Sequence, residues 1–202
     1  MKLLIATHNR GKLREYQEIF RDLDLELLTL DDVGITRDVE ETGATFEENA
    51  RLKADAYARA SGLLTLADDS GLEVDALGGE PGVFSKRYAG EEKTDAERNA
   101  YLLEKLRAVP PEQRAARFRC VIAIADARGN MLTTEGTCEG EIAFAPRGTN
   151  GFGYDPIFIV GDSGKHLAEF PSKEKNKISH RGRAAEKARA IVQNRLNKKE
   201  WS

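Results

Sequence analysis

The sequence predicts a mixed α/β fold. In the first half of the chain, short apolar segments typical of β-strands alternate with amphipathic helical patterns. A hairpin signal stands in the middle, and one helical pattern closes the chain. This order is typical of strands and helices layered on a shared sheet, not of an all-β protein or a helical bundle. The 202 residues contain no internal repeat or low-complexity tract, so we expect a single domain over residues 1–202.

The first third of the chain predicts three strands and two helices. The strands are expected at 2–6, 25–30 and 63–67, the first helix carries Leu13, Tyr16 and Phe20 on one face, and the second runs from a Thr45 cap to Gly62. Glu48 stands three residues after Thr45, which completes the capping-box pattern. After the third strand, Asp68-Asp69-Ser70-Gly71 is expected to form a turn, because these residue types favour turns.

The remaining elements follow from caps, prolines and β-prone runs. We expect a loop at 78–94, a helix from the Thr94/Glu97 capping box to Pro110, strands at 118–125, 131–138, 142–145 and 156–160, and a last helix capped by Ser179. Gly129-Asn130 suits the hairpin turn between the first two of these strands. The last helix is expected to face inward with Ala184, Ala188, Ile191 and Leu196.

Composition and charge exclude several classes of protein. The two cysteines, Cys120 and Cys138, fit no CxxC metal or redox pattern, and we expect two reduced core thiols. No apolar run approaches the ~20 residues of a membrane span or resembles a signal peptide. The net charge of −3 does not suit a protein that coats nucleic acid. We therefore expect a soluble, cytoplasmic protein without membrane or nucleic-acid partners.

Two clusters in the first half of the chain suit an anion and a metal ion. Thr7-His8-Asn9-Arg10-Gly11-Lys12 follows a strand and opens a helix, where backbone N–H groups and side-chain donors attract phosphate. The alternative is an ordinary helix cap by Asn9 or Thr7. The second cluster is Asp68-Asp69-Ser70-Gly71, because adjacent carboxylates repel less when they share a cation such as Mg²⁺. Its alternative is a plain acidic turn.

Two clusters in the second half suit a nucleoside. Gly151-Phe152-Gly153-Tyr154-Asp155-Pro156 offers glycines for close approach, aromatic rings for stacking and a carboxylate for ring N–H groups. The alternative is a β-turn with Phe152 in the core. Residues 173–181 are basic, and cations in the first turn after Ser179 oppose the helix dipole, which suggests an anionic or carbonyl ligand. The alternative is a solvated basic helix end.

In order, these motifs resemble those of the inosine triphosphate pyrophosphatase family, the dITP/XTP pyrophosphatases that remove non-standard purine nucleotides. The resemblance runs over nearly the whole chain. It is carried by Thr-x-Asn-x-x-Lys at 7–12, Glu40-Glu41-Thr42-Gly43 with Phe46-x-Glu48-Asn49-Ala50 and Lys53, Ala67-Asp68-Asp69-Ser70-Gly71-Leu72, Gly78-Gly79-x-Pro81-Gly82, Gly151 to Phe158, and Ser179-His180-Arg181.

The resemblance implies an elongated central sheet flanked by helices, two lobes with the nucleotide cleft between them, a homodimer, and Mg²⁺-dependent hydrolysis of NTP to NMP and pyrophosphate. Carried over by position, it implies catalytic Asp69, Lys12 and Lys53; metal ligands Glu40 and Asp69 supported by Asp68; and substrate contacts Thr7, His8, Asn9, Arg10, Gly11, Lys12, Ser70, Phe152, Gly153, Tyr154, Asp155, Lys175, His180 and Arg181.

Discrimination among purines is expected at position 6 of the ring. Inosine and xanthine carry a carbonyl there, to which His180 or Arg181 would donate, whereas adenine presents an amino group and leaves two donors facing each other. The exclusion of guanine has no evident residue. Two other hypotheses remain, a related pyrophosphatase for pyrimidine or modified nucleotides and a non-enzymatic nucleotide or nucleic-acid binder using the basic residues 173–199.

Overall fold

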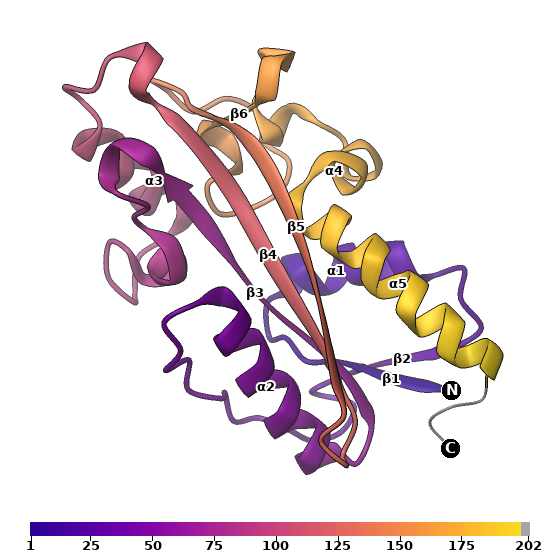
Figure 1. The fold of residues 1–202 in the computed structure, drawn as a ribbon. Helices are drawn as coiled ribbons and strands as arrows, with labels where there is room; N and C mark the ends of the chain where they lie inside the picture. The colour runs from indigo at the N-terminus through magenta and orange to yellow at the C-terminus, as the bar shows by residue number, and fades with distance from the viewer. Residues whose placement is uncertain (199–202) are drawn as a thin grey trace. The chain divides into compact units, whose positions relative to one another are not determined.

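A mixed sheet runs through residues 1–198, the part of the chain that this computed structural model describes. Its strands follow the order β2-β1-β3-β4-β5-β6 (Figure 1). They span β1 Lys2–Ile5, β2 Glu26–Thr29, β3 Leu64–Val74, β4 Ala115–Ala125, β5 Met131–Ile142 and β6 Phe158–Val160. β1 pairs in parallel with β2 and β3, whereas β5 and β6 are antiparallel. The predicted mixed α/β class is confirmed.

The helices begin and end largely where the sequence predicts. They span α1 Arg10–Phe20, α2 Phe46–Ser61, α3 Asp95–Lys105, α4 Ser172–Ile178 and α5 His180–Lys198. Asn9 and Thr45 cap α1 and α2 through their side-chain oxygens, and Gly62 ends α2 in the left-handed conformation. Thr94 and Glu97 form the complete capping box of α3.

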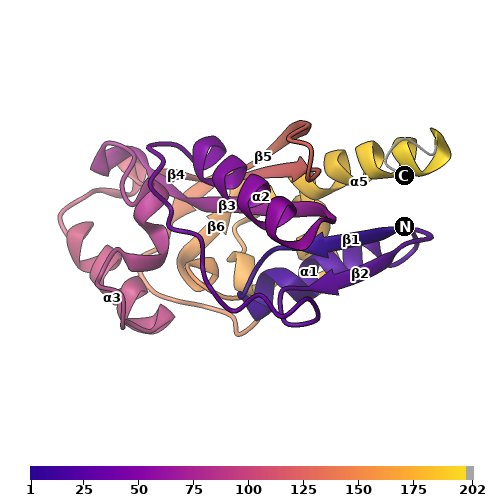
Figure 2. The same ribbon diagram turned by 90° about the horizontal axis from the view of Figure 1, so that it is seen from below.

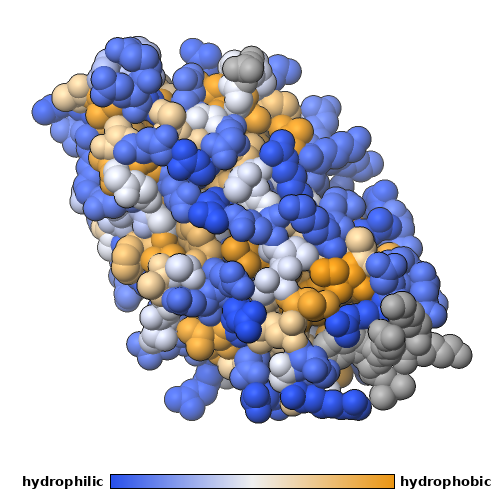
Figure 3. Space-filling view, viewed as in Figure 1, coloured by the Kyte–Doolittle hydropathy of each residue, from blue (hydrophilic) through white to orange (hydrophobic). Residues whose placement is uncertain are grey.

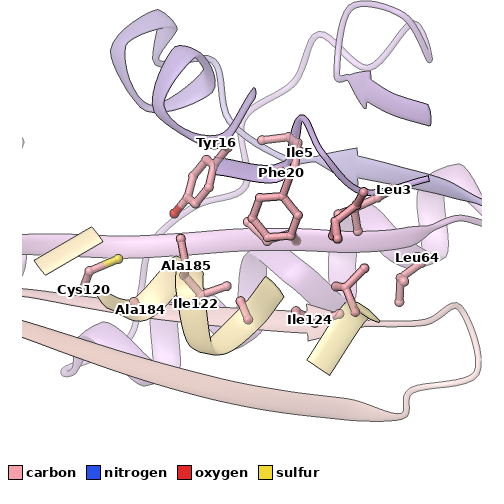
Figure 4. Close-up of a cluster of buried hydrophobic side chains, with 14 residues drawn as sticks. Leu3, Ile5, Tyr16, Phe20, Leu64, Cys120, Ile122, Ile124, Ala184 and Ala185 are labelled. Atoms are coloured by element: carbon pink, nitrogen blue, oxygen red, sulfur yellow. The ribbon is translucent and has the colours of Figure 1, made fainter. Parts of the chain in front are cut away.

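The chain divides into two compact units. Within the described residues, the first contains 1–69, 120–136 and 181–198, and the second contains 70–119 and 137–180. The core of the first unit joins apolar side chains of β1, β3 and β4 to α1 and α5 (Figure 4). It includes Leu3, Ile5, Tyr16, Phe20, Leu64, Leu66, Cys120, Ile122, Ile124, Ala184, Ala185, Ala188 and Val192. In the same unit, α2 lies alongside the first half of β3 (Figures 1 and 2).

The second unit has a core of its own. Leu72 and Val74 of β3 pack with Leu102 and Leu106 from α3 and the segment that follows it. Residues of β4, β5 and β6 complete this core, together with Tyr154, Ile157 and Leu167 from the connecting segments. The single domain expected over residues 1–202 and the two lobes that the resemblance implies both stay predictions.

Several predicted elements were wrong in detail. Residues 68–71 do not turn, because β3 continues through them to Val74. Residues 142–145 are not a separate strand, since Ile142 ends β5. The loop predicted at 78–94 contains a 3₁₀ helix at Gly82–Arg87, and α4 was not predicted at all. At residues 68–71, the place of β3 in the sheet overrides the local turn signal.

The surface and the cysteines follow the composition. Hydrophilic residues cover most of the face in Figure 3, with apolar residues gathered in small patches between them. Among residues 1–198, no helix combines the length and the apolar character that crossing a bilayer requires. Cys120 and Cys138 are buried and form no disulfide, as predicted.

Candidate active site

Two neighbouring aspartates in β3 point to opposite sides of the sheet. Side chains alternate along a strand, so Asp68 shares its side with Leu64 and Leu66, which pack against α1 and α5. Asp69 points the other way and contacts α2. A turn would have allowed both carboxylates to converge, but the observed strand points them to opposite sides of the sheet, while the charges of Lys12 and Lys53 act on both.

Asp68 lies among cations in the interior of the first unit. Its side chain is 1% exposed, and its Oδ2 lies 2.9 Å from Lys12 Nζ and 3.6 Å from Arg181 Nε. The thiol of Cys120 is 3.8 Å from the same oxygen. Burial alone would raise the pKa of Asp68, but the charges of Lys12 and Arg181 outweigh it and hold this pKa well below the ordinary value. The folded state therefore favours the charged form of Asp68.

Arg181 belongs to this same buried group. Its Nη1 lies 2.6 Å from Glu15 Oε2, and both side chains are buried. Arg181 was expected to contact the nucleoside alongside Phe152 and Asp155, but in the first unit its guanidinium holds Asp68 and Glu15. Sequence reasoning missed Glu15. Its one signal is its place three residues after Lys12, which puts both side chains on one face of α1.

Asp69 faces α2 and has a different environment. Asn49 Nδ2 donates to Asp69 Oδ2 at 3.1 Å, and Lys53 Nζ lies 3.7 Å from Oδ1. Asn49 and Lys53 are four residues apart and therefore share one face of the helix. Burial raises the pKa of Asp69 above its ordinary value, and the charge of Lys53 offsets this only in part. A carboxylate with a raised pKa is a better proton acceptor near neutral pH.

A second carboxylate near Asp69 comes from Glu41. Glu41 Oε1 lies 2.5 Å from Lys53 Nζ, and its charge also raises the pKa of Asp69. Glu40, the expected metal ligand, is exposed. The oxygen of Asn49 accepts from the N–H of Gly43 at 2.7 Å, which ties this acidic loop to α2. In the described residues, no three His, Cys, Asp or Glu side chains gather in a metal-binding group.

The loop at 7–12 is organised by its cap. Asn9 Oδ1 accepts from the N–H groups of Gly11 and Lys12 at 2.8 and 3.1 Å, so the helix-cap alternative is confirmed. Thr7 Oγ1 accepts from the N–H of Asn9 at 3.1 Å. His8 pairs with the exposed Asp38 at 3.5 Å, and Arg10 is exposed. From this loop, Lys12 reaches Asp68.

The 151–155 loop of the second unit is built around a buried ion pair. Asp155 Oδ2 accepts from Lys175 Nζ at 2.6 Å and from the N–H of Phe152 at 2.9 Å. Lys175 Nζ also lies 4.7 Å from the centroid of the Phe152 ring. A Cβ at Gly151 would stand 2.0 Å from Asp155 Oδ2, so only glycine fits there. The structure thus brings three predicted site residues together.

The other residues of the second unit have more structural roles. Tyr154 is buried in the core, and its hydroxyl donates to the carbonyl of Ser85 at 2.9 Å. Phe152, which is half-buried, is therefore the ring of this loop that is available for stacking. His180 is buried and stacks on Phe118, with centroids 4.6 Å apart and planes 10° apart. Ser70 follows Asp69 in β3 and is half-buried.

The pattern of both units can be compared with known proteins. The sequence model of the Ham1 family matches residues 3–191. The chain belongs to the Ham1 family. A dITP/XTP pyrophosphatase of Bacillus subtilis (strain 168) is 50% identical to this Ham1 chain over 190 residues, which cover 94% of the chain and 96% of the relative. A dITP/XTP pyrophosphatase of Geobacter sulfurreducens is 52% identical over 183 residues, covering 91% and 92%.

A solved structure supports the same assignment. The HAM1 protein of Coxiella burnetii superposes on this Ham1 chain with a TM-score of 0.88 and 46% sequence identity. The superposition covers 96% of this chain and 99% of that protein. At this identity and coverage, the two proteins share the fold over essentially their full lengths.

Proposed function

We propose that the protein hydrolyses non-standard purine nucleoside triphosphates, dITP, ITP and XTP, to the monophosphate and pyrophosphate. Asp69 carries this proposal, because it is a carboxylate of raised pKa beside the Lys53 ammonium group. The names of the relatives give the substrate class. Such an enzyme removes these nucleotides from the pool of precursors for nucleic-acid synthesis.

In the proposed reaction, water attacks the α-phosphorus of the triphosphate. A P–O bond forms to the water oxygen, the bond between the α-phosphorus and the bridging oxygen breaks, and pyrophosphate leaves with the electron pair. Asp69 accepts the proton of the attacking water. Lys53 and Lys12 stabilise the charge that develops on the leaving pyrophosphate.

Magnesium is the cofactor that we propose for this site. Hard carboxylate oxygens suit it, and it needs only one or two of them beside phosphate oxygens and water. Asp69 fits because burial of its charge is unfavourable and a cation would relieve that cost. Glu41 lies near Asp69, and Glu40 precedes Glu41 in the chain, so either carboxylate would be the second metal ligand beside Asp69. Asp68, on the other side of β3, would support the site through its contact with Lys12. Bound there, the ion would neutralise phosphate charge.

At the nucleoside end, we propose that Phe152 stacks on the base and that Asp155 reads ring N–H groups. The Lys175 ammonium group lies 2.6 Å from the Asp155 carboxylate, and both side chains are buried in the second unit. His180 and Arg181 remain the proposed donors to the 6-carbonyl. For Arg181, that role would require its guanidinium to exchange its bond with Glu15 for one with the base.

The decisive experiment measures pyrophosphate release from dITP, ITP, XTP and the four standard ribonucleotides, with Mg²⁺ present or chelated. We expect release from the first three that needs Mg²⁺ and exceeds release from ATP by about 10⁴-fold, since a buried donor would face the adenine amino group. Hydrolysis of ITP no faster than that of ATP contradicts the proposed specificity, and activity in excess chelator contradicts the metal requirement.

We also propose that the protein is a cytoplasmic homodimer, as the resemblance implies. Light scattering coupled to size-exclusion chromatography gives the mass directly. The sequence corresponds to 22.4 kDa, so a dimer would have twice this mass. A mass of one chain at micromolar concentration would refute the dimer. Cell fractionation tests the location.

A further inference from the structure

We infer that Asp95 and Asn99 of α3 are positioning residues that hold the 151–155 loop in place and so help to set base specificity. The contacts of Asp95 and Asn99 with Gly153 are observed within the second unit. Their consequence for specificity rests on the proposed function, because it requires Phe152 and Asp155 to contact the base. Neither Asp95 nor Asn99 belongs to the motifs that predict the site.

The two glycines that flank Phe152 give this segment a flexible backbone. Phe152 stands between Gly151 and Gly153, which adopt φ angles of +77° and +64°. Two glycines lose more backbone entropy on ordering than any other pair, so a fixed direction of the Phe152 ring needs hydrogen bonds that hold the backbone. Asp155 supplies one by accepting from the N–H of Phe152.

The polar groups of the next residue are both held by α3. The N–H of Gly153 donates to Asp95 Oδ2 at 2.7 Å, and the carbonyl of Gly153 accepts from Asn99 Nδ2 at 3.2 Å. Asp95 and Asn99 stand four residues apart and therefore share one face of the helix. Two side chains on one face of α3 thus bond the N–H and the carbonyl of Gly153, the residue that follows Phe152.

The burial of Asn99 suggests that this contact is retained for a purpose. Asn99 is 6% exposed, and its Oδ1 has no hydrogen-bond partner among the residues that the structure describes. A buried acceptor without a partner is unfavourable, so an apolar side chain of similar size would suit the packing better. The bond that Asn99 does make goes to the Gly153 carbonyl. The presence of a polar side chain at Asn99 is therefore better explained by its hydrogen bond to the 151–155 loop than by packing in the core.

The test compares four variants of the full chain. Asp95→Ala and Asn99→Leu each remove one grip on Gly153, whereas Asp95→Asn keeps an oxygen that accepts from its N–H. Glu97→Ala is the matched control, because it breaks the capping box of the same helix without touching Gly153. The first readout is hydrogen–deuterium exchange of peptides that cover residues 147–158, measured without nucleotide. The second is steady-state kinetics with ITP and ATP, with inorganic pyrophosphate as an inhibitor.

We expect Asp95→Ala and Asn99→Leu to accelerate exchange at Gly153 and to raise KM for ITP about tenfold, the effect of one lost hydrogen bond. The preference for ITP over ATP should fall with it, while the inhibition constant of pyrophosphate stays constant. Asp95→Asn should restore most of both. Unchanged exchange, or equal effects from Glu97→Ala, overturns the inference. A native protein that hydrolyses no triphosphate overturns the proposed function instead, and exchange still decides whether α3 holds the loop.

Discussion

The same substitution at two adjacent positions should destabilise the fold at Asp68 but not at Asp69. Asp68→Asn removes a charge whose pKa is lowered by Lys12 and Arg181, so the folded state favours that charge. Asp69→Asn removes a charge whose pKa is raised by burial, so the folded state disfavours it. By linkage, Asp68 stabilises the fold above its ordinary pKa of 3.8, and this stability is lost as pH falls through its lowered pKa. For Asp69 the sign reverses.

The magnitude follows from burial. Removing one partner of a buried ion pair costs about 3–5 kcal/mol. Because Lys12 is 15% exposed and Arg181 keeps Glu15, we expect the lower end for Asp68→Asn, about 3 kcal/mol. In a chain of this size that lowers Tm by about 6–12 °C. Asp69→Asn should leave the free energy of unfolding at pH 7 unchanged or raised, while turnover falls by about 10²- to 10⁴-fold, as for a lost general base.

Urea unfolding followed by circular dichroism measures the first quantity, and pyrophosphate release from ITP at fixed Mg²⁺ measures the second. Both substitutions keep side-chain volume, so each variant is the other's control. The reasoning is refuted if Asp69→Asn is the more destabilised of the two. It is also refuted if Asp69→Asn retains native turnover, because the proton acceptor would then have to be another group.

Three further predictions concern Asp69 and the 151–155 loop. Gly151→Ala should raise KM for ITP about tenfold, because a Cβ would stand 2.0 Å from Asp155 Oδ2 at a φ of +77° and break a contact worth one hydrogen bond; a native KM would contradict it. In the metal-free protein, the carboxyl group of Asp69 should titrate with a pKa above 3.8, because burial raises this pKa; a pKa at or below 3.8 in an NMR titration would rule this out. Lys175→Met should cost about 3–5 kcal/mol in urea unfolding, because it removes the cation from buried Asp155; an unchanged midpoint would show that the pair contributes nothing.

Local signals predicted the helices well because their determinants are local. Asn9, Thr45 and Thr94 cap the helices that they precede, and Gly62 has the left-handed conformation that ends α2. The order of the sheet depends instead on pairings between distant segments. Nothing near Asp68 indicates that β3 continues, because Asp, Ser and Gly are disfavoured in strands and are retained here by the pairing and burial of β3.

The site shows the same division. Residue types identified Lys12, Asp69 and Lys175 as chemically suited to phosphate, metal or base, and the family resemblance added Lys53. They did not identify which charges neutralise one another. Glu15, Asp95 and Asn99 belong to helices whose patterns gave only an amphipathic face, and their roles become visible only when the partner segment is in place. Partners that lie 58 or 166 positions away leave no periodic trace in the sequence.

The alternation of side chains along β3 explains how two adjacent aspartates have pKa values shifted in opposite directions. Alternation sends Asp68 toward Lys12 and Arg181, where two cations favour its charge, and Asp69 toward Asn49 and Lys53, where burial prevails. If both side chains faced one cavity, the charge of each would raise the pKa of the other. Because the strand separates them, Lys12 is held by Asp68 while Asp69 stays able to accept a proton. A strand at this position is therefore better suited to the proposed chemistry than the turn that the sequence predicts.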